Sequence, residues 1–251
     1  NIYENPSVEQ WPKLCQRVVQ DNSAIAERVE AIVERVREQG DEALYALAEQ
    51  IDGVRLSRLE VSQQEFEQAE KAVSDDVRQA IEVAIRNIES FHRAQLPCQV
   101  SVETQPGVRC VQRPVAIGRV GLYIPGGTAP LFSTVLMLAL PAVIAGCRFI
   151  ELCTPTSSCG EVAAEVLYAA RRCGVHKVYK IGGAQAIAAM AYGTQTVGKV
   201  DKIFGPGNRY VTLAKQLVAS RNTAIDMPAG PSEVMVMADE TADARFVAAD
   251  M

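Results

Sequence analysis

Four polar side chains in this chain stand beside turns that are rich in glycine and proline: Tyr123, Gln185, Asn208 and Ser232. Each turn follows a short apolar run. A glycine turn lets backbone N–H groups approach a phosphate, and a helix that follows adds the positive end of its dipole. The pattern therefore favours binding of a phosphate-containing ligand, with polar groups nearby that help to orient it.

The turns span residues 123–127, 181–185, 204–208 and 226–233. Each lies where a strand is expected to lead into a helix or into another strand. In an open α/β sheet, ligands bind at the carboxyl ends of the strands. We therefore expect these turns to form one ligand-binding edge from segments that lie far apart in the sequence.

Three of these side chains, and the turns themselves, also have a purely structural interpretation. Tyr123 fits a strand aromatic, Asn208 a helix cap, and Ser232 a turn closed by a serine. The glycine turns taken singly are also typical of ordinary strand-to-helix connections. The segment 205–210 has the first two glycines of the dinucleotide fingerprint but Tyr210 in place of the third. Both interpretations stay open at this point.

The spacing of apolar residues predicts the elements that position these turns. Residues 1–97 are expected to be helical, with a capping box at Ser62–Glu65 and a last apolar stripe that reaches Phe91. Residues 99–115 suggest a hairpin or two neighbouring strands. From Gly118 onward, strands are expected at 120–124, 149–153, 177–181, 200–204, 224–227 and 233–238, and helices at about 131–146, 160–173, 184–192, 208–220 and from 241. This alternation predicts an α/β fold, with Rossmann-like parallel sheet layers and a helical N-terminal region.

Composition excludes several classes of protein. The 251 residues carry a net charge of −5, which argues against nucleic-acid binding. The longest apolar run, 131–147, is short for a membrane span and contains Pro141 and Gly146. The first residues lack the pattern of a signal peptide. We therefore expect a cytoplasmic protein.

The cysteines and histidines show no metal or disulfide pattern. The seven cysteines are odd in number, spread out and contain no Cys-x-x-Cys. Cys153 falls in an expected strand and is interpreted as a small buried apolar residue. Neither His92 nor His176 has a second ligand at a recognised spacing. The sequence thus predicts no metal site in this chain.

The last expected helix is unfinished at Met251. Phe246 and Val247 begin an apolar stripe, and no cap or glycine follows. We expect the natural protein to continue further.

Five long motifs in order give the chain a specific resemblance. They are VGLYIPGG (120–127), APLFSTVLM (129–137), GGAQAIAA (182–189), VDKIFGPGN (200–208) and IDMPAGPSEV (225–234). With shorter matches at 41–44 and 103–110, the chain resembles the histidinol dehydrogenase family over nearly its whole length.

The resemblance implies a function and roles for residues. Tyr123, Gln185 and Asn208 match NAD-contacting positions, and Ser232 matches a substrate-contacting position. The family oxidises L-histidinol to L-histidine through L-histidinal by two hydride transfers, in the last steps of histidine biosynthesis. A Glu-His pair transfers protons, and zinc holds the substrate. Members of the family are homodimers. Each subunit has two Rossmann-like halves in an aldehyde-dehydrogenase-like layout.

The catalytic and zinc-binding motifs of the family are expected beyond Met251. We therefore expect this stretch to carry the NAD part of the machinery and to be inactive alone. The expected organisation is a helical region with the start of the first α/β domain (1–119), an NAD-binding domain (120–231), and a segment returning to the first domain (232–251).

Two other functions remain open from the residues. One is another dehydrogenase of the same layout, which usually needs a nucleophilic cysteine, yet no cysteine lies in a glycine-rich turn. The other is a non-catalytic module that binds a dinucleotide or a protein partner.

Overall fold

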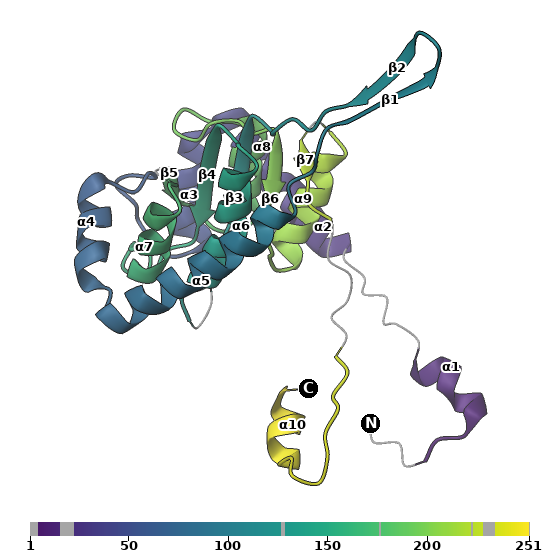
Figure 1. The fold of residues 1–251 in the computed structure, drawn as a ribbon. Coiled ribbons are helices and arrows are strands. Elements are labelled where there is room, and N and C mark those ends of the chain that lie inside the picture. The colour runs from purple at the N-terminus through teal and green to yellow at the C-terminus, as the bar shows by residue number, and fades with distance from the viewer. Residues whose placement is uncertain are drawn as a thin grey trace.

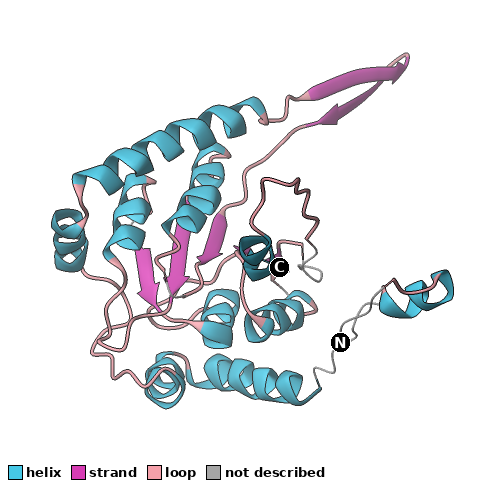
Figure 2. Ribbon diagram, turned by 90° about the horizontal axis from the view of Figure 1, so that it is seen from below, coloured by secondary structure: helices cyan, strands magenta, loops and turns pink. Residues whose placement is uncertain are grey.

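A parallel five-stranded sheet forms the centre of the molecule and is covered by helices on both faces (Figure 1, Figure 2). The computed structural model describes residues 5–15, 23–126, 129–175, 177–221, 223–227 and 234–250. The sheet contains β3 (Arg119–Tyr123), β4 (Phe149–Thr154), β5 (Lys177–Lys180), β6 (Lys202–Phe204) and β7 (Ala224–Ile225). The predicted α/β class and Rossmann-like sheet are confirmed.

The strand order β5-β4-β3-β6-β7 changes direction in the middle of the sheet. The chain begins at β3, adds β4 and β5 on one side, and then crosses over to add β6 and β7 on the other. This is the order 3-2-1-4-5 of a doubly wound sheet, and the switch point lies between β3 and β6. The carboxyl ends of these two strands carry the turns that begin at Tyr123 and Gly205.

One face of the sheet is covered by α4 (Gln63–Ala72), α5 (Asp75–Ala94), α6 (Phe132–Ile144) and α7 (Ala164–Arg172). Leu122 and Leu152 of the sheet pack into the core on this side, together with Leu136 of α6. The predicted capping box starts α4, since Ser62 and Glu65 exchange hydrogen bonds there. The expected stripe on α5 is correct for Ile81 and Ile85, which are buried.

Phe91 was wrongly expected to continue that stripe. Its side chain is 64% exposed, because the last turns of α5 extend past the edge of the core.

The opposite face is covered by α2 (Ser23–Gln39), α3 (Asp41–Ile51), α8 (Gly183–Tyr192) and α9 (Arg209–Ala219). Helix α8 is buried from Ala184 to Ala191, between the sheet and helices α2 and α9. Small side chains let it approach the strands closely: a Cβ added to Gly121 would lie 2.6 Å from the Met190 sulfur. The alanines of α8 therefore serve packing, as expected for a helix that is apolar on every side.

A separate antiparallel hairpin, β1 (Val100–Gln105) and β2 (Val108–Gln112), projects away from the sheet (Figure 1, Figure 2). It confirms the strands expected within 99–115. Every residue of both strands is exposed.

Three short elements lie near the ends of the chain: a 3-10 helix (Val8–Gln10), α1 (Trp11–Leu14) and α10 (Ala244–Asp250). The strand expected at 233–238 is wrong for its described part, because residues 234–239 form neither helix nor strand. Alternating apolar residues need a neighbouring strand to become part of a sheet, and none pairs with this segment in the described structure. No helix formed by the described residues is long and apolar enough to cross a lipid bilayer.

Candidate functional site

The predicted glycine turns meet at the carboxyl edge of the sheet. A Cβ added to Gly205 would lie 2.1 Å from the Tyr123 carbonyl oxygen, so the turns after β3 and β6 touch at the switch point. A Cβ on Gly126 or on Gly182 would lie 2.7 Å from the Pro155 ring. The turns after β3, β4 and β5 are therefore packed side by side. The prediction of one shared edge is confirmed for the residues that the structure describes.

Tyr123 and Gln185 both lie against Gly183. The Tyr123 hydroxyl accepts a hydrogen bond from the Gly183 N–H at 3.0 Å, and only 4% of Tyr123 is exposed. Burial raises the pKa of the Tyr123 hydroxyl above its ordinary value. Gly183 has φ +62°, and a Cβ there would lie 2.8 Å from Oε1 of Gln185. A glycine is needed at this point for both conformation and space.

The Gln185 side chain is held from outside the sheet. Its amide nitrogen donates to Oδ2 of Asp52 at 3.3 Å, and 3% of the residue is exposed. Desolvation raises the pKa of Asp52, and the hydrogen bond from Gln185 opposes this rise. Asp52 closes α3, so a helix of the N-terminal region fixes the orientation of this amide.

Asn208 is the N-cap of α9, and its Oδ1 accepts a hydrogen bond from the Val211 N–H at 3.2 Å. The capping interpretation is therefore correct. Asn208 is also exposed, and its amide nitrogen has no partner among the described residues. That nitrogen is available to a ligand beside the turn. Ser232, the fourth predicted residue, lies outside the described residues.

Sequence reasoning did not find Lys215 and Asp226, which hold the turn at Gly205. The Lys215 ammonium contacts Asp226 and donates to the Gly205 carbonyl oxygen at 2.8 Å. Oδ2 of Asp226 accepts the Gly205 N–H at 2.8 Å. A signal was present, since Lys215 interrupts the buried stripe formed by Val211, Ala214 and Val218 on α9. A lysine at a buried helical position requires a specific partner.

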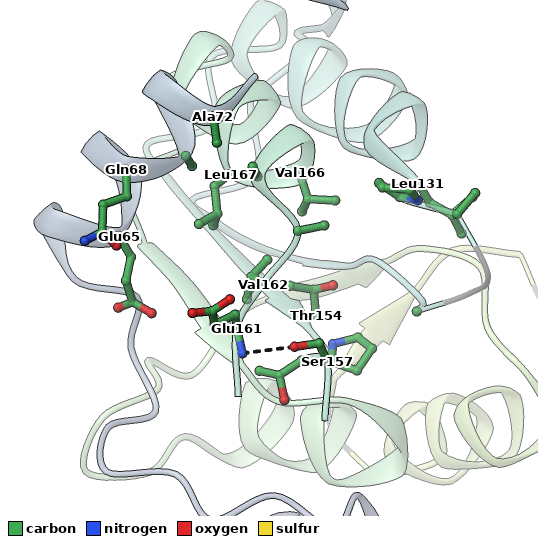
Figure 3. Close-up of a pocket in the computed structure, with 18 of the residues that line it drawn as sticks. Glu65, Gln68, Ala72, Leu131, Thr154, Ser157, Glu161, Val162, Val166 and Leu167 are labelled. Atoms are coloured by element: carbon green, nitrogen blue, oxygen red, sulfur yellow. Dashed lines mark hydrogen bonds between the residues drawn. The ribbon is translucent and has the colours of Figure 1, made fainter. Parts of the chain in front are cut away.

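A pocket of about 530 Å³ lies between the turns after β3 and β4 and the helices α4 and α7 (Figure 3). Its walls combine Leu131, Val162 and Leu167 with the hydroxyls of Thr154 and Ser157. Tyr123, Gln185 and Asn208 do not line this pocket. The pocket could not be predicted from the sequence, because its walls come from turns and helices that only the fold brings together.

Two carboxylates also border this pocket. Glu65 is engaged by Lys180 at 2.5 Å and by the capping box. The Glu161 backbone N–H donates to the Ser157 hydroxyl, while its carboxylate has no partner among the described residues. No basic side chain is among the described residues that line the pocket, so this lining disfavours an anionic group and suits one that carries hydroxyls.

The described cysteines are all unpaired with one another, and Cys153 is fully buried as expected. Burial raises the pKa of the Cys153 thiol far above its ordinary value, which leaves it unreactive. His176 lies outside the described residues. In the part of the chain that the structure describes, no three His, Cys, Asp or Glu side chains are grouped so that they could hold a metal ion.

Comparison with known proteins gives a consistent result. A family profile described as "Histidinol dehydrogenase" matches residues 15–251. Histidinol dehydrogenase from Bacteroides thetaiotaomicron is 55% identical over 250 residues, which cover 100% of this chain and 58% of that protein. The Haemophilus influenzae protein of the same name is 54% identical over 253 residues, with the same coverage.

A solved structure has the same fold. The crystal structure of histidinol dehydrogenase from Elizabethkingia anophelis superposes with a TM-score of 0.89 at 48% identity, over 99% of this chain and 57% of that one. The chain thus spans less than two thirds of the length of these relatives. The profile and the identities establish that the chain belongs to the histidinol dehydrogenase family.

Proposed function

We propose that this chain supplies the NAD-binding part of an enzyme that oxidises L-histidinol to L-histidine through L-histidinal, in the last steps of histidine biosynthesis. One observation carries the proposal: the family's glycine turns converge at the switch point of a doubly wound sheet. In such sheets, nucleotides bind at the carboxyl ends of the strands, at this switch point. Family membership supports the identity of the substrate.

The described residues fit a dinucleotide. The Asn208 amide nitrogen and the Gly207 N–H provide donors at the N-terminus of α9, where a phosphate is stabilised. The pocket beside Glu161 has room, apolar walls and hydroxyl groups suited to a nucleoside. The Glu161 carboxylate, which has no partner among the described residues, can accept from ribose hydroxyls. When bound, NAD supplies the acceptor for the two hydrides. Tyr123 and Gln185 contact it in this proposal.

Zinc does not fit the described residues, which offer no group of ligands for a metal ion. We therefore derive no step through zinc from this chain. The proposal places the zinc ligands and the Glu-His pair beyond Met251, in the part of the relatives that this chain does not span.

The test uses the longer protein that contains this sequence, together with residues 1–251 alone. Oxidation of L-histidinol is followed by the absorbance of NADH, and binding of NAD is measured by titration calorimetry. We expect turnover by the longer protein and none by 1–251. Turnover by 1–251 would contradict the assignment of catalysis to later sequence, and no turnover by the longer protein would contradict the function.

The residue roles are tested in the longer protein with variants that keep the local structure. Asn208→Asp retains the cap of α9, since Asp caps as well as Asn, but removes the amide donor. Gln185→Met retains the volume of the side chain. Each is expected to raise the Kd for NAD by about tenfold or more. Asn87→Asp, an exposed asparagine on α5, is the matched control. Unchanged Kd values in well-folded variants would refute the roles.

The proposal also includes the wider setting that the resemblance implies. The enzyme is a cytoplasmic homodimer, and Ser232 contacts L-histidinol. The odd, scattered cysteines favour a reducing compartment. The division into 1–119, 120–231 and 232–251 is part of the same proposal. Sedimentation of the longer protein at a mass of one chain would contradict the dimer.

A further inference from the structure

Lys215 and Asp226 bind both backbone polar groups of one residue, Gly205, in the proposed cofactor-binding turn. Asp226 accepts the N–H of Gly205 at 2.8 Å, and Lys215 donates to the Gly205 carbonyl oxygen at 2.8 Å. The two side chains also contact each other as an ion pair. Lys215 comes from the second turn of α9, and Asp226 follows β7 directly. We call these two residues the clamp.

The clamp is buried enough to act as a fixed unit. The Lys215 side chain is 8% exposed and that of Asp226 is 28% exposed. A charge at such depth is costly unless it is paired and hydrogen-bonded, so each member requires the other. Gly205 itself has φ +133° and no room beside the Tyr123 carbonyl. The turn is therefore held by the clamp on one side and by β3 on the other.

The position of the clamp relates three parts of the proposed site. Lys215 belongs to the same helix that Asn208 caps, so Asn208 and Lys215 are parts of one rigid element. Asp226 lies directly after β7 and pairs with Lys215, so it connects α9 to the end of that strand. Ser232 follows six residues later in the sequence. The clamp also lines a second pocket, of about 270 Å³, together with Gly207 and Thr212.

We propose that Lys215 and Asp226 are positioning residues for the dehydrogenase reaction: together they set the turn 205–208 against Tyr123 so that it can bind NAD. This inference rests on the proposed function. Without the clamp, Gly205 loses both hydrogen bonds, and Asn208 is no longer held at a fixed distance from the turn after β3. Neither residue touches the reacting atoms in this proposal.

The experiment measures the Kd for NAD by titration calorimetry in the longer protein that contains this sequence. Lys215→Met keeps the length of the side chain and removes the charge, and Asp226→Asn keeps the shape. Each is expected to raise the Kd by about tenfold or more. The Kd of the double variant is expected to lie within about threefold of the Kd of the single variant that binds NAD more weakly, because both changes release the same turn. Lys215→Arg, which restores a cation, is expected to recover part of the affinity.

Arg119→Met is the matched control for loss of a buried ion pair. Arg119 pairs with the buried Glu151 at 2.9 Å, at the amino edge of the sheet, away from the turns. We expect it to lower thermal stability and leave the Kd for NAD within about twofold. All measurements are made where circular dichroism shows each variant to be folded.

The outcomes separate this inference from the proposed function. If Lys215→Met and Asp226→Asn lower the unfolding temperature as Arg119→Met does but keep the wild-type Kd, the clamp is merely structural and the inference is wrong. The inference is also wrong if the fold-increase in Kd of the double variant equals the product of the two single fold-increases. If the unaltered protein neither binds NAD nor oxidises L-histidinol, the proposed function itself has failed.

Discussion

Residues at the carboxyl edge of the sheet carry structural and chemical roles at once. Asn208 caps α9 with its oxygen, while its amide nitrogen has no partner among the described residues. Tyr123 accepts a hydrogen bond from Gly183 while lying within the core. The structural interpretation of such a residue therefore does not exclude a functional one. The two roles are separable by variants that preserve one of them, which is the purpose of Asn208→Asp.

A second residue, Glu65, makes stability depend on pH. Burial would raise the pKa of its carboxyl group, but hydrogen bonds from Lys180 and Ser62 outweigh this and lower the pKa below its ordinary value. A lowered pKa in the folded state contributes stability above the pKa of the unfolded state, and this contribution is lost as pH falls through the folded value.

We therefore expect Glu65→Gln to reduce the free energy of unfolding by about 1 kcal/mol at pH 7, since it weakens the capping box and the contact with Lys180. The difference from wild type should shrink as pH falls below about 4.5, the ordinary pKa of a glutamate. Urea denaturation of both proteins at several pH values measures this difference in the free energy of unfolding. Glu67→Gln, on the exposed side of the same helix, is the control. An equal loss at pH 3 and pH 7 would contradict the assignment.

At the scale of elements, the hairpin β1–β2 differs from the rest of the fold. Val100, Val102 and Val108 are about half exposed, and the strands pair mainly with each other. A two-stranded hairpin is marginally stable in water when no further layer covers it. The contribution of the hairpin to the stability of residues 1–251 should therefore be small.

Hydrogen exchange on residues 1–251 is expected to show little protection in β1 and β2, in contrast to strong protection in β3 and β4. Val102→Ser should change the free energy of unfolding by less than about 0.5 kcal/mol. The equivalent change at the buried Val120 of β3 should cost more than about 2 kcal/mol. Strong protection of the hairpin amides would show that it is covered.

For the whole molecule, one sheet joins two apolar cores. Leu136 of α6 is fully buried in the core on one face, and Ile187 of α8 is fully buried in the core on the other. Because both cores are built on the same strands, neither face can be lost without exposing the sheet. The described body should therefore unfold as one cooperative unit.

Leu136→Ala and Ile187→Ala are each expected to cost about 2–5 kcal/mol, because each leaves a cavity in a closed core. Their effects should add to within about 0.5 kcal/mol, since the sheet separates the two sites. Denaturation followed by both fluorescence and circular dichroism should give coincident single transitions. Separate transitions for the two faces would contradict a single unit.

Sequence reasoning predicted the elements well where a local signal was strong. The capping box at Ser62, the buried strands and the alanine-rich helix that begins at Gly183 follow from patterns within a few residues. It was wrong for 233–238, where the alternation is typical of a strand but no partner strand lies beside the described part. A strand requires hydrogen bonds from another segment, and a pattern in one segment cannot supply them.

The sequence by itself determined the α/β class, the family resemblance and the identity of the turns with their polar neighbours. These depend on local periodicity and on the order of motifs along the chain. Only the tertiary structure decided that the turn at Gly205 touches Tyr123, that Lys215 and Asp226 hold it, and that a pocket opens beside Glu161. Each of these features brings together residues from different elements. Their proximity depends on strand order and close packing, which the pattern within a single segment cannot predict.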